Sequence, residues 1–235
     1  MSSSPILKPL ARIGLLSFLL IVLVLTGFWD SYFSKLPIKN ISISFYFHVH
    51  AIIVSMWIVL LILQPLFIVR KNLKMHRLIG KISYAVFPLM VLSIIWVSHF
   101  SFTTAINPPP IQLFIPFKDV ILLCVMFSIG ICFKSNPMIH GKAMIATGII
   151  CLEPALTQTV MLFTEPTLMA YPVTITIIYM TILVFILYEW KHSSGRWIML
   201  GLLFVLILSH SFILSGCESS YWNHFTIWFS NLPLT

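Results

Sequence analysis

The sequence predicts an all-helical integral membrane protein, a single bundle of seven transmembrane helices over residues 1–235, on three observations. Apolar residues make up 59% of the chain and charged residues only 9%, against roughly 25% charged in an ordinary soluble domain. The mean hydropathy is +1.02. Apolar runs of about 20 residues, the length that crosses a bilayer core, recur along the whole chain.

The runs that meet this length define seven predicted spans: 10–28, 45–69, 78–99, 114–133, 142–163, 168–188 and 197–215. The first run follows Lys8 and Arg12 and has no small-residue cleavage site after it, so we expect a retained helix and not a signal peptide. The final stretch, 217–235, is too polar and too short for an eighth span. Its Tyr and Trp side chains suit the headgroup region, where aromatic residues gather.

The basic residues set the orientation of the bundle. Eleven of them fall on the side of the N-terminus: Lys8, Arg12, Arg70, Lys71, Lys74, Arg77, Lys81, Lys134, Lys142, Lys191 and Arg196. The opposite side has three, Lys35, Lys39 and Lys118. Because cytoplasmic loops carry the excess of Lys and Arg, we predict a multi-pass protein of a bacterial inner membrane with a cytoplasmic N-terminus and an external C-terminus.

The net charge of +8 follows from this loop pattern and from attraction to anionic lipid headgroups. The sequence has no helix-turn-helix, zinc-finger or aromatic RNA-binding signature. We therefore expect the lipid bilayer, and possible association with a larger membrane complex, as partners, and no nucleic acid.

Several polar side chains share one predicted depth near the outer surface. His50, Asp119 and His210 each lie about five residues inside the outer end of a span, and His48 and His99 lie slightly nearer the surface, so the layer is roughly 5–8 Å deep. Imidazole and carboxylate ligands suit zinc, copper or non-haem iron, which makes His48, His50, Asp119 and His210 the predicted metal ligands.

Two opposed histidines of this layer, from His50, His99 and His210, are alternatively candidate axial ligands of a b-type haem. Two other interpretations stay open. In one, these side chains only form hydrogen bonds to one another, to backbone and to water; in the other, they contact a substrate or a proton.

His76 and His140 form a second, cytoplasmic set at the start of two predicted helices, about 25–30 Å from His50 at the helical rise. They are candidate ligands of a second haem or metal if the third and fifth helices are neighbours. Helix N-termini beside basic groups also bind anions such as lipid phosphate. The remaining interpretation is that both side chains reach to the interface.

Glu153 lies near the predicted middle of the fifth span, followed by Pro154 and, one turn on, Gln158. Intramembrane carboxylates are functional hypotheses by default, so these residues and Gln64 are predicted to line a proton or substrate path. A hydrogen bond between helices is the competing interpretation.

His50, Trp57 and Gln64 follow one another at intervals of seven residues. Such positions drift by only about 20° per step around a helix. We therefore expect the three side chains to lie on one face and to point into the bundle, since Gln64 would have no partner in lipid.

Two short segments resemble each other, "NLKMHRLIG" (72–80) and "NPMIHGKAM" (136–144), each with a histidine four residues after an asparagine at the start of a predicted span. The spans that they open also contain Pro88 and Pro154 at similar depths. Such echoes can mark duplicated halves.

These motifs carry a resemblance that covers most of the chain. An HxH start followed by Trp, Gln and HRxxG, and a later HxxxMxAT element, resemble a family of uncharacterised bacterial multi-pass membrane proteins. The matching positions are His48, His50, Trp57, Gln64, His76, Arg77, Gly80, Asp119, His140, Met144, Ala146 and Thr147. Gly141, Lys142 and Ala143 depart from the family's basic run. The resemblance implies a membrane bundle and no particular activity, and the two histidine layers are also distantly similar to di-haem cytochromes of the b561 type.

The sequence lacks a Walker loop, a GxGxxG turn, a GxSxG elbow and an HExxH pair, and whether the protein is an enzyme stays open. The first functional hypothesis is haem or metal binding for electron transfer or as an accessory subunit of a membrane complex. The second is a small proton-coupled transporter or channel that uses Glu153. The third is a purely structural membrane subunit.

Overall fold

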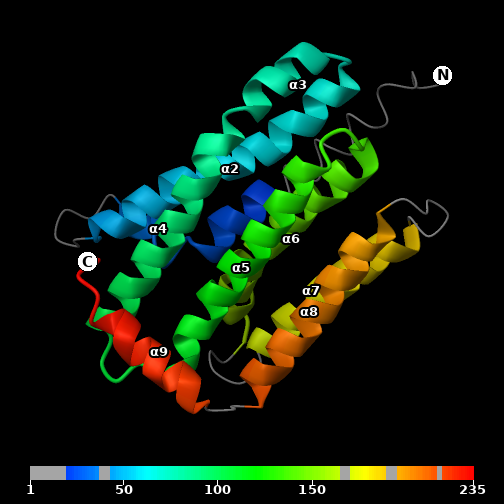
Figure 1. Ribbon diagram of the computed structural model, residues 1–235. Coiled ribbons are helices and arrows are strands. Elements are labelled where there is room, and N and C mark those ends of the chain that lie inside the picture. The colour runs from blue at the N-terminus through cyan, green and yellow to red at the C-terminus, as the bar shows by residue number, and fades with distance from the viewer. Residues whose placement is uncertain (1–19, 37–42, 165–169, 189–194, 216–218) are drawn as a thin grey trace. The chain divides into compact units, whose positions relative to one another are not determined.

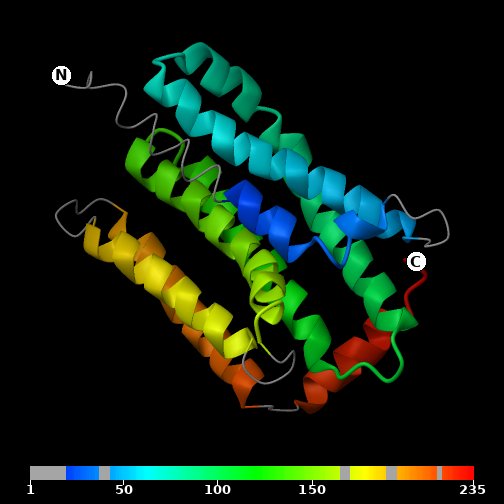
Figure 2. The same ribbon diagram turned by 180° about the vertical axis from the view of Figure 1, so that it is seen from behind.

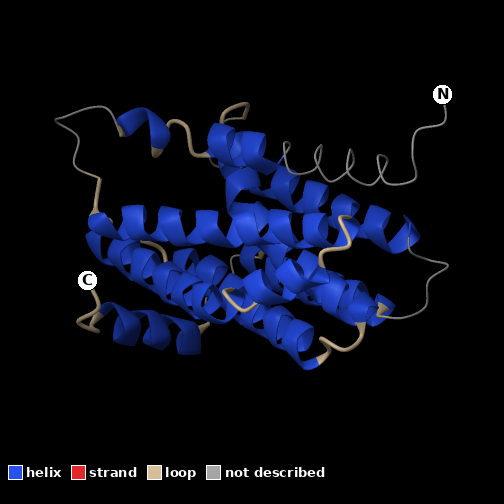
Figure 3. Ribbon diagram, turned by 90° about the horizontal axis from the view of Figure 1, so that it is seen from above, coloured by secondary structure: helices blue, strands red, loops and turns tan. Residues whose placement is uncertain are grey.

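The computed structural model describes residues 20–36, 43–164, 170–188, 195–215 and 219–235. Every regular element in these ranges is a helix (Figure 3). Six helical segments are long and apolar enough to cross a membrane: Phe45–Val69, Leu73–Thr104, Ile111–Cys132, Pro137–Met161, Ala170–Leu187 and Arg196–Leu214. The prediction of an all-helical, multi-pass membrane protein is therefore confirmed at this level.

Six of the seven predicted spans correspond to these segments, and 45–69 matches α2 (Phe45–Val69) at both ends. The predicted span 78–99 lies within α3 (Leu73–Gly80) and α4 (Ser83–Thr104), which follow one another with a short break. Of the predicted span 10–28, residues 20–27 are helical and 10–19 lie outside the described residues.

The chain divides into two compact units, and a single domain stays a prediction. The first comprises residues 1–93 and 154–164, and the second comprises residues 94–153 and 165–235. α4 and α6 (Pro137–Met161) each contribute one part to each unit.

In the first unit, α2 lies beside α3 (Figure 1), and one stripe of α2 makes the contacts. His50 Nδ1 lies 3.0 Å from Ser93 Oγ, and Trp57, 1% exposed, packs edge-on against Phe87 with ring centroids 5.4 Å apart. The predicted inward face of α2 is thus confirmed.

Gln64 completes this stripe. With its amide oriented to satisfy both groups, its nitrogen donates to His76 Nδ1 (2.6 Å) and its oxygen accepts from the Gly80 N–H (3.1 Å). The seven-residue spacing of the motif therefore matches an antiparallel packing of α2 against α3 and α4, in which His50 and Gln64 are hydrogen-bonded and Trp57 packs against Phe87.

The helical residues 20–27 pack on the 154–164 part of α6 in the same unit. A Cβ at Gly27 would collide with the backbone of Ala155, so only glycine allows this close approach. Thr159 Oγ1 donates to the Leu23 carbonyl nearby (3.4 Å).

The second unit contains α5 (Ile111–Cys132), α7 (Ala170–Tyr188), α8 (Arg196–Leu214) and α9 (Ser220–Ser230). α7 and α8 run side by side in both views (Figures 1 and 2). α9 is too short to span, as expected, and packs its aromatic face on α5: Phe117 contacts the rings of Trp222, Phe225 and Phe229, with centroids 5.0–6.2 Å apart.

The two echoing segments share their local structure. Asn72 caps α3 by accepting from the Met75 N–H (3.1 Å), and the Asn136 side chain accepts from the Met138 N–H at the start of α6 (3.1 Å). In each case the histidine four residues later bonds the preceding long helix: His76 bonds Gln64, and His140 Nδ1 lies 2.7 Å from the Gly130 carbonyl oxygen. The echo is thus a repeated capping and docking device.

Replacing Trp57 by alanine should destabilise the first unit strongly, because it removes a fully buried indole between α2 and α4. Trp→Ala substitutions in cores lower stability by roughly 3–5 kcal/mol. We expect a clearly lower thermal midpoint of the purified protein in detergent. Ile52→Ala on the same helix is the control, since Ile52 is 62% exposed. An equal loss in the two variants would contradict the packing described above.

Candidate functional site: a buried charge cluster

Four ionisable side chains meet in the interior of the second unit, contributed by α5, α6 and α8. Lys118 and Asp119 are each 6% exposed, Glu153 is 2% exposed and His210 is 1% exposed. The Lys118 ammonium is at the centre: Nζ lies 2.7 Å from both Glu153 carboxylate oxygens, 2.9 Å from Asp119 Oδ1 and 3.2 Å from His210 Nε2.

Glu153 is the most completely hydrogen-bonded carboxylate of the cluster. It accepts both bonds from Lys118, its Oε1 accepts from the Tyr171 hydroxyl (3.2 Å), and its Oε2 lies 3.3 Å from His210 Nε2. A buried lysine requires a compensating anion, and this geometry makes Glu153 the counter-ion of Lys118.

Asp119 is held differently. Its Oδ1 is close to the Lys118 ammonium but has no hydrogen-bond donor in suitable geometry among the described residues. With His210 neutral, the ammonium and the two carboxylates sum to one negative charge. Because an uncompensated charge in an apolar interior is expensive, the cluster has one place for an additional proton, on Asp119 or on His210.

His210 has a partner at each ring nitrogen. Nδ1 lies 3.0 Å from the Tyr179 hydroxyl, and Nε2 faces both the Lys118 ammonium, which only donates, and the Glu153 carboxylate, which accepts. The imidazole is flanked by two aromatic rings: Tyr179 stacks on it at 5.6 Å and Tyr171 meets it edge-on at 5.8 Å.

The prediction that set Glu153 apart from Asp119 and His210 is wrong. It counted depth from a span starting at residue 142, but α6 begins at Pro137, so Glu153 lies sixteen residues from its start and eight from its end. That shift moves the carboxylate along the helix to the level of His210, which it contacts.

The sequence counts Lys118 among the basic residues of the outer side, but the structure buries it within a helix. α5 begins at Ile111, and Lys118 lies seven residues inside it. The signal that could have revealed it is the Lys118–Asp119 pair itself, since apolar runs flank it on both sides. No sequence pattern marks Tyr171 and Tyr179, because their partners are distant in the chain.

The cluster is not suited to a metal ion. The position between Asp119, Glu153 and His210 is taken by the Lys118 ammonium, which repels a cation. In the part of the chain that the structure describes, no three His, Cys, Asp or Glu side chains gather as metal ligands. The haem and metal assignments for the other histidines stay predictions.

The other predicted residues of the outer layer have hydrogen-bond partners within their own units. His48 Nδ1 shares a 2.8 Å bond with the Tyr32 hydroxyl, and burial raises the pKa of Tyr32, so this hydroxyl keeps its proton. Since Ser93 Oγ donates to the Met90 carbonyl, it accepts from the His50 Nδ1–H.

His99, 2% exposed, bonds Thr235 Oγ1 through Nδ1 (2.6 Å), and its Nε2 has no hydrogen-bond partner among the described residues. It packs edge-on against Phe229 of α9.

The residues of the predicted path fall in different environments. Gln64 is engaged with His76 and Gly80 in the first unit, and Gln158 is half-buried in α6. Glu153 belongs to the charge cluster of the second unit. A route that joins the three stays a prediction.

The comparisons with known proteins add no relative. No protein-family model, curated protein or solved structure matches the chain. The resemblance to the bacterial family therefore stays an interpretation of the motifs, and the charge cluster is the strongest indication of function in the described residues.

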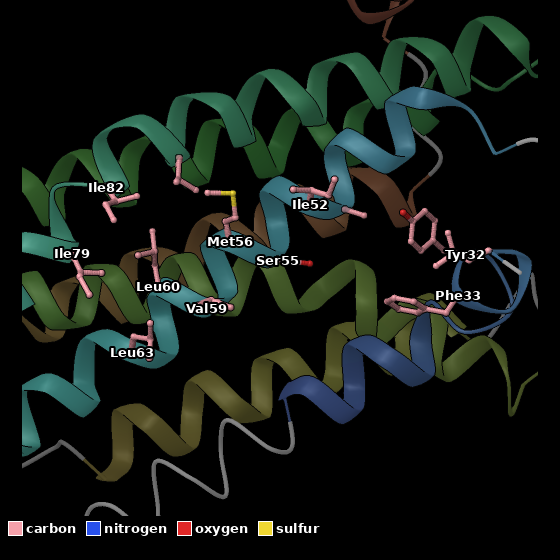
Figure 4. Close-up of a pocket in the computed structure, with 13 residues that line it drawn as sticks. Tyr32, Phe33, Ile52, Ser55, Met56, Val59, Leu60, Leu63, Ile79 and Ile82 are labelled. Carbon is pink, nitrogen blue, oxygen red and sulfur yellow. The ribbon is translucent and has the colours of Figure 1, made fainter.

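A pocket of about 700 Å³ in the first unit is a weaker candidate. It runs along α2, with Tyr32 and Phe33 opposite that helix (Figure 4). Its lining is apolar except for Tyr32 and Ser55, so no carboxylate, imidazole or amine side chain of the described residues lines it.

Replacing Lys118 by methionine should destabilise the second unit severely, because two buried carboxylates lose their cation. Removing one partner of a buried pair costs roughly 3–5 kcal/mol. The measurement is the thermal midpoint in detergent, with the exposed Lys134→Met as control. The double variant K118M/E153Q should recover part of the loss, and K118M with wild-type stability would contradict the ion pair.

Proposed function

We propose that the protein is a small proton-coupled membrane transporter whose cluster of Lys118, Asp119, Glu153 and His210 binds and releases one proton. The single observation that carries this proposal is the buried ammonium in contact with two carboxylates and an imidazole. Such a set differs from a plain structural ion pair because its two carboxylates face a single ammonium, which leaves one negative charge unbalanced when His210 is neutral.

The chemistry that follows is reversible protonation coupled to a conformational change. Lys118 and Glu153 form the fixed ion pair and link α5 to α6. Addition or loss of the proton changes the net charge of the cluster by one unit inside a low-dielectric interior. Because each charge state favours a different arrangement of the surrounding helices, a proton bound here can bias a two-state transporter.

Glu153 thus takes part as the counter-ion, and Asp119 and His210 are the groups that exchange the proton. The hydrogen bonds of Glu153 support its role as the ionised counter-ion, because its carboxylate accepts from Lys118 and from Tyr171. Asp119 Oδ1, by contrast, lies 2.9 Å from the Lys118 ammonium without hydrogen-bond geometry and has no second donor among the described residues.

We further propose seven spans in a bacterial inner membrane, with the N-terminus in the cytoplasm. The structure adjusts the charge count that supports this orientation, because Lys118 and Lys142 are buried in helices. Without these two, ten basic residues remain on the predicted cytoplasmic side and two on the other.

Reporter fusions test this topology. Phosphatase fused after Lys35 or after residue 235 should be active, whereas the same enzyme fused after Lys71 should be inactive. Fluorescent-protein fusions at the same positions should give the opposite pattern. Phosphatase activity after Lys71 would contradict the orientation.

Proton coupling is tested in proteoliposomes that contain a pH-sensitive dye. Pools of amino acids, sugars, nucleosides and inorganic ions are added outside, and at least one pool should move protons faster than in empty liposomes. Asp119→Asn should abolish this movement, because it removes the excess negative charge that the additional proton balances. The exposed Asp30→Asn is the matched control and should retain it.

Two results would contradict the proposal: no pool moves protons with the wild-type protein, or D119N moves them at the wild-type rate. A visible spectrum of the same sample separates the proposal from haem-based electron transfer, for which a Soret band is expected.

A further inference from the structure

The hydrogen bonds around His210 are compatible with every protonation state of its ring. When Nδ1 carries the hydrogen, it donates to the Tyr179 oxygen while Nε2 accepts from the Lys118 ammonium. When Nε2 carries it, the ring donates to Glu153 Oε2 and accepts from the Tyr179 hydroxyl. The doubly protonated ring donates to Glu153 and to Tyr179.

A ring with satisfied partners in all three states can gain or lose a proton without moving its heavy atoms. The groups that face it are Lys118 of α5 with the adjacent Asp119, Glu153 of α6, and Tyr171 and Tyr179 of α7.

The two ring nitrogens differ in access. Nε2 is enclosed by Lys118 and Glu153, both almost fully buried. The Tyr179 hydroxyl is the only hydrogen-bond partner of Nδ1 among the described residues, and this tyrosine is half-buried. Tyr171 bonds Glu153 and meets His210 only through its ring edge.

We infer that His210 holds the exchangeable proton of the cluster and that Tyr179 relays it between His210 Nδ1 and water. This inference rests on the proposed proton coupling and names the route of that proton.

In the uptake step the Tyr179 hydroxyl proton moves to Nδ1, and the hydroxyl oxygen takes a replacement proton from a hydronium ion. One imidazolium forms, one hydronium becomes water, and Tyr179 is unchanged. Release is the reverse. Tyr179 lies midway along α7, nine residues from each end of Ala170–Tyr188, so this route requires water to reach the middle of the span.

The test is infrared difference spectroscopy of the purified full chain after a rapid drop in pH. Bands that disappear in His210→Gln are assigned to the imidazole, and bands that disappear in Asp119→Asn to that carboxyl group. The amplitude of a band reports how many protein molecules bind the proton at that group. The rate at which the band appears reports whether the proton can still use the proposed route.

Tyr179→Phe should keep the full imidazole amplitude and slow its appearance by about a hundredfold or more, the low end of what a positioned proton-transfer group contributes. Tyr221→Phe is the matched control: it removes one tyrosine hydroxyl from a side chain that is 90% exposed on α9, and it should leave the imidazole amplitude and rate unchanged.

Three results would overturn the inference. A wild-type rate in Y179F means that the proton takes another route. Loss of the imidazole amplitude in Y179F, with the thermal midpoint retained, means that Tyr179 only holds the ring. A pH response of the Asp119 carboxyl without an imidazole response places the proton on Asp119 and leaves the proposed function intact. If the wild-type protein shows neither response, the proposed function itself fails.

Discussion

The ion pair between Lys118 and Glu153 is the constraint on which the second unit depends. An ammonium buried among helices of a membrane protein is tolerated only with a compensating anion and a full set of acceptors. Here α5 supplies the cation, α6 supplies the anion, and α8 adds the imidazole that contacts both. These helices therefore meet at a defined register. From α7, the Tyr171 hydroxyl bonds Glu153 and the Tyr179 hydroxyl bonds His210.

The first unit solves a similar problem with neutral groups. On the inner stripe of α2, His50 bonds Ser93 of α4 and Gln64 bonds His76 and Gly80 of α3, so amide, hydroxyl and imidazole groups pair there without a buried charge. This contrast separates the motifs by role. His50, Trp57 and Gln64 fix the packing of α2 on α3 and α4, whereas the residues with an unbalanced charge lie in the second unit. Hydrogen bonds and packing account for the former, and the unbalanced charge of the latter is the basis of the proposed proton binding.

Much of the helical framework could be predicted from the sequence, because span length and period follow from local composition. The limits of α2, the inward face through Trp57 and the absence of an eighth span in α9 all agree with expectation. The predictions failed where the position of a residue depends on a contact with another residue far away in the chain. Lys118 is counted with the outer surface until the structure shows it beside Glu153, 35 positions away. The depth of Glu153 was misjudged because the predicted span begins at residue 142, five residues after Pro137, where α6 begins.

The sequence by itself determined that the chain forms long apolar helices, since the bilayer requires about 20 apolar residues per span and satisfied backbone groups throughout. It also identified Asp119, Glu153 and His210 as groups that need an explanation. Only the tertiary structure decided that they share one cluster with a lysine at its centre. The physical reason is that depth along a helix is encoded locally, whereas rotation about its axis and the choice of neighbour depend on contacts between residues far apart in the chain.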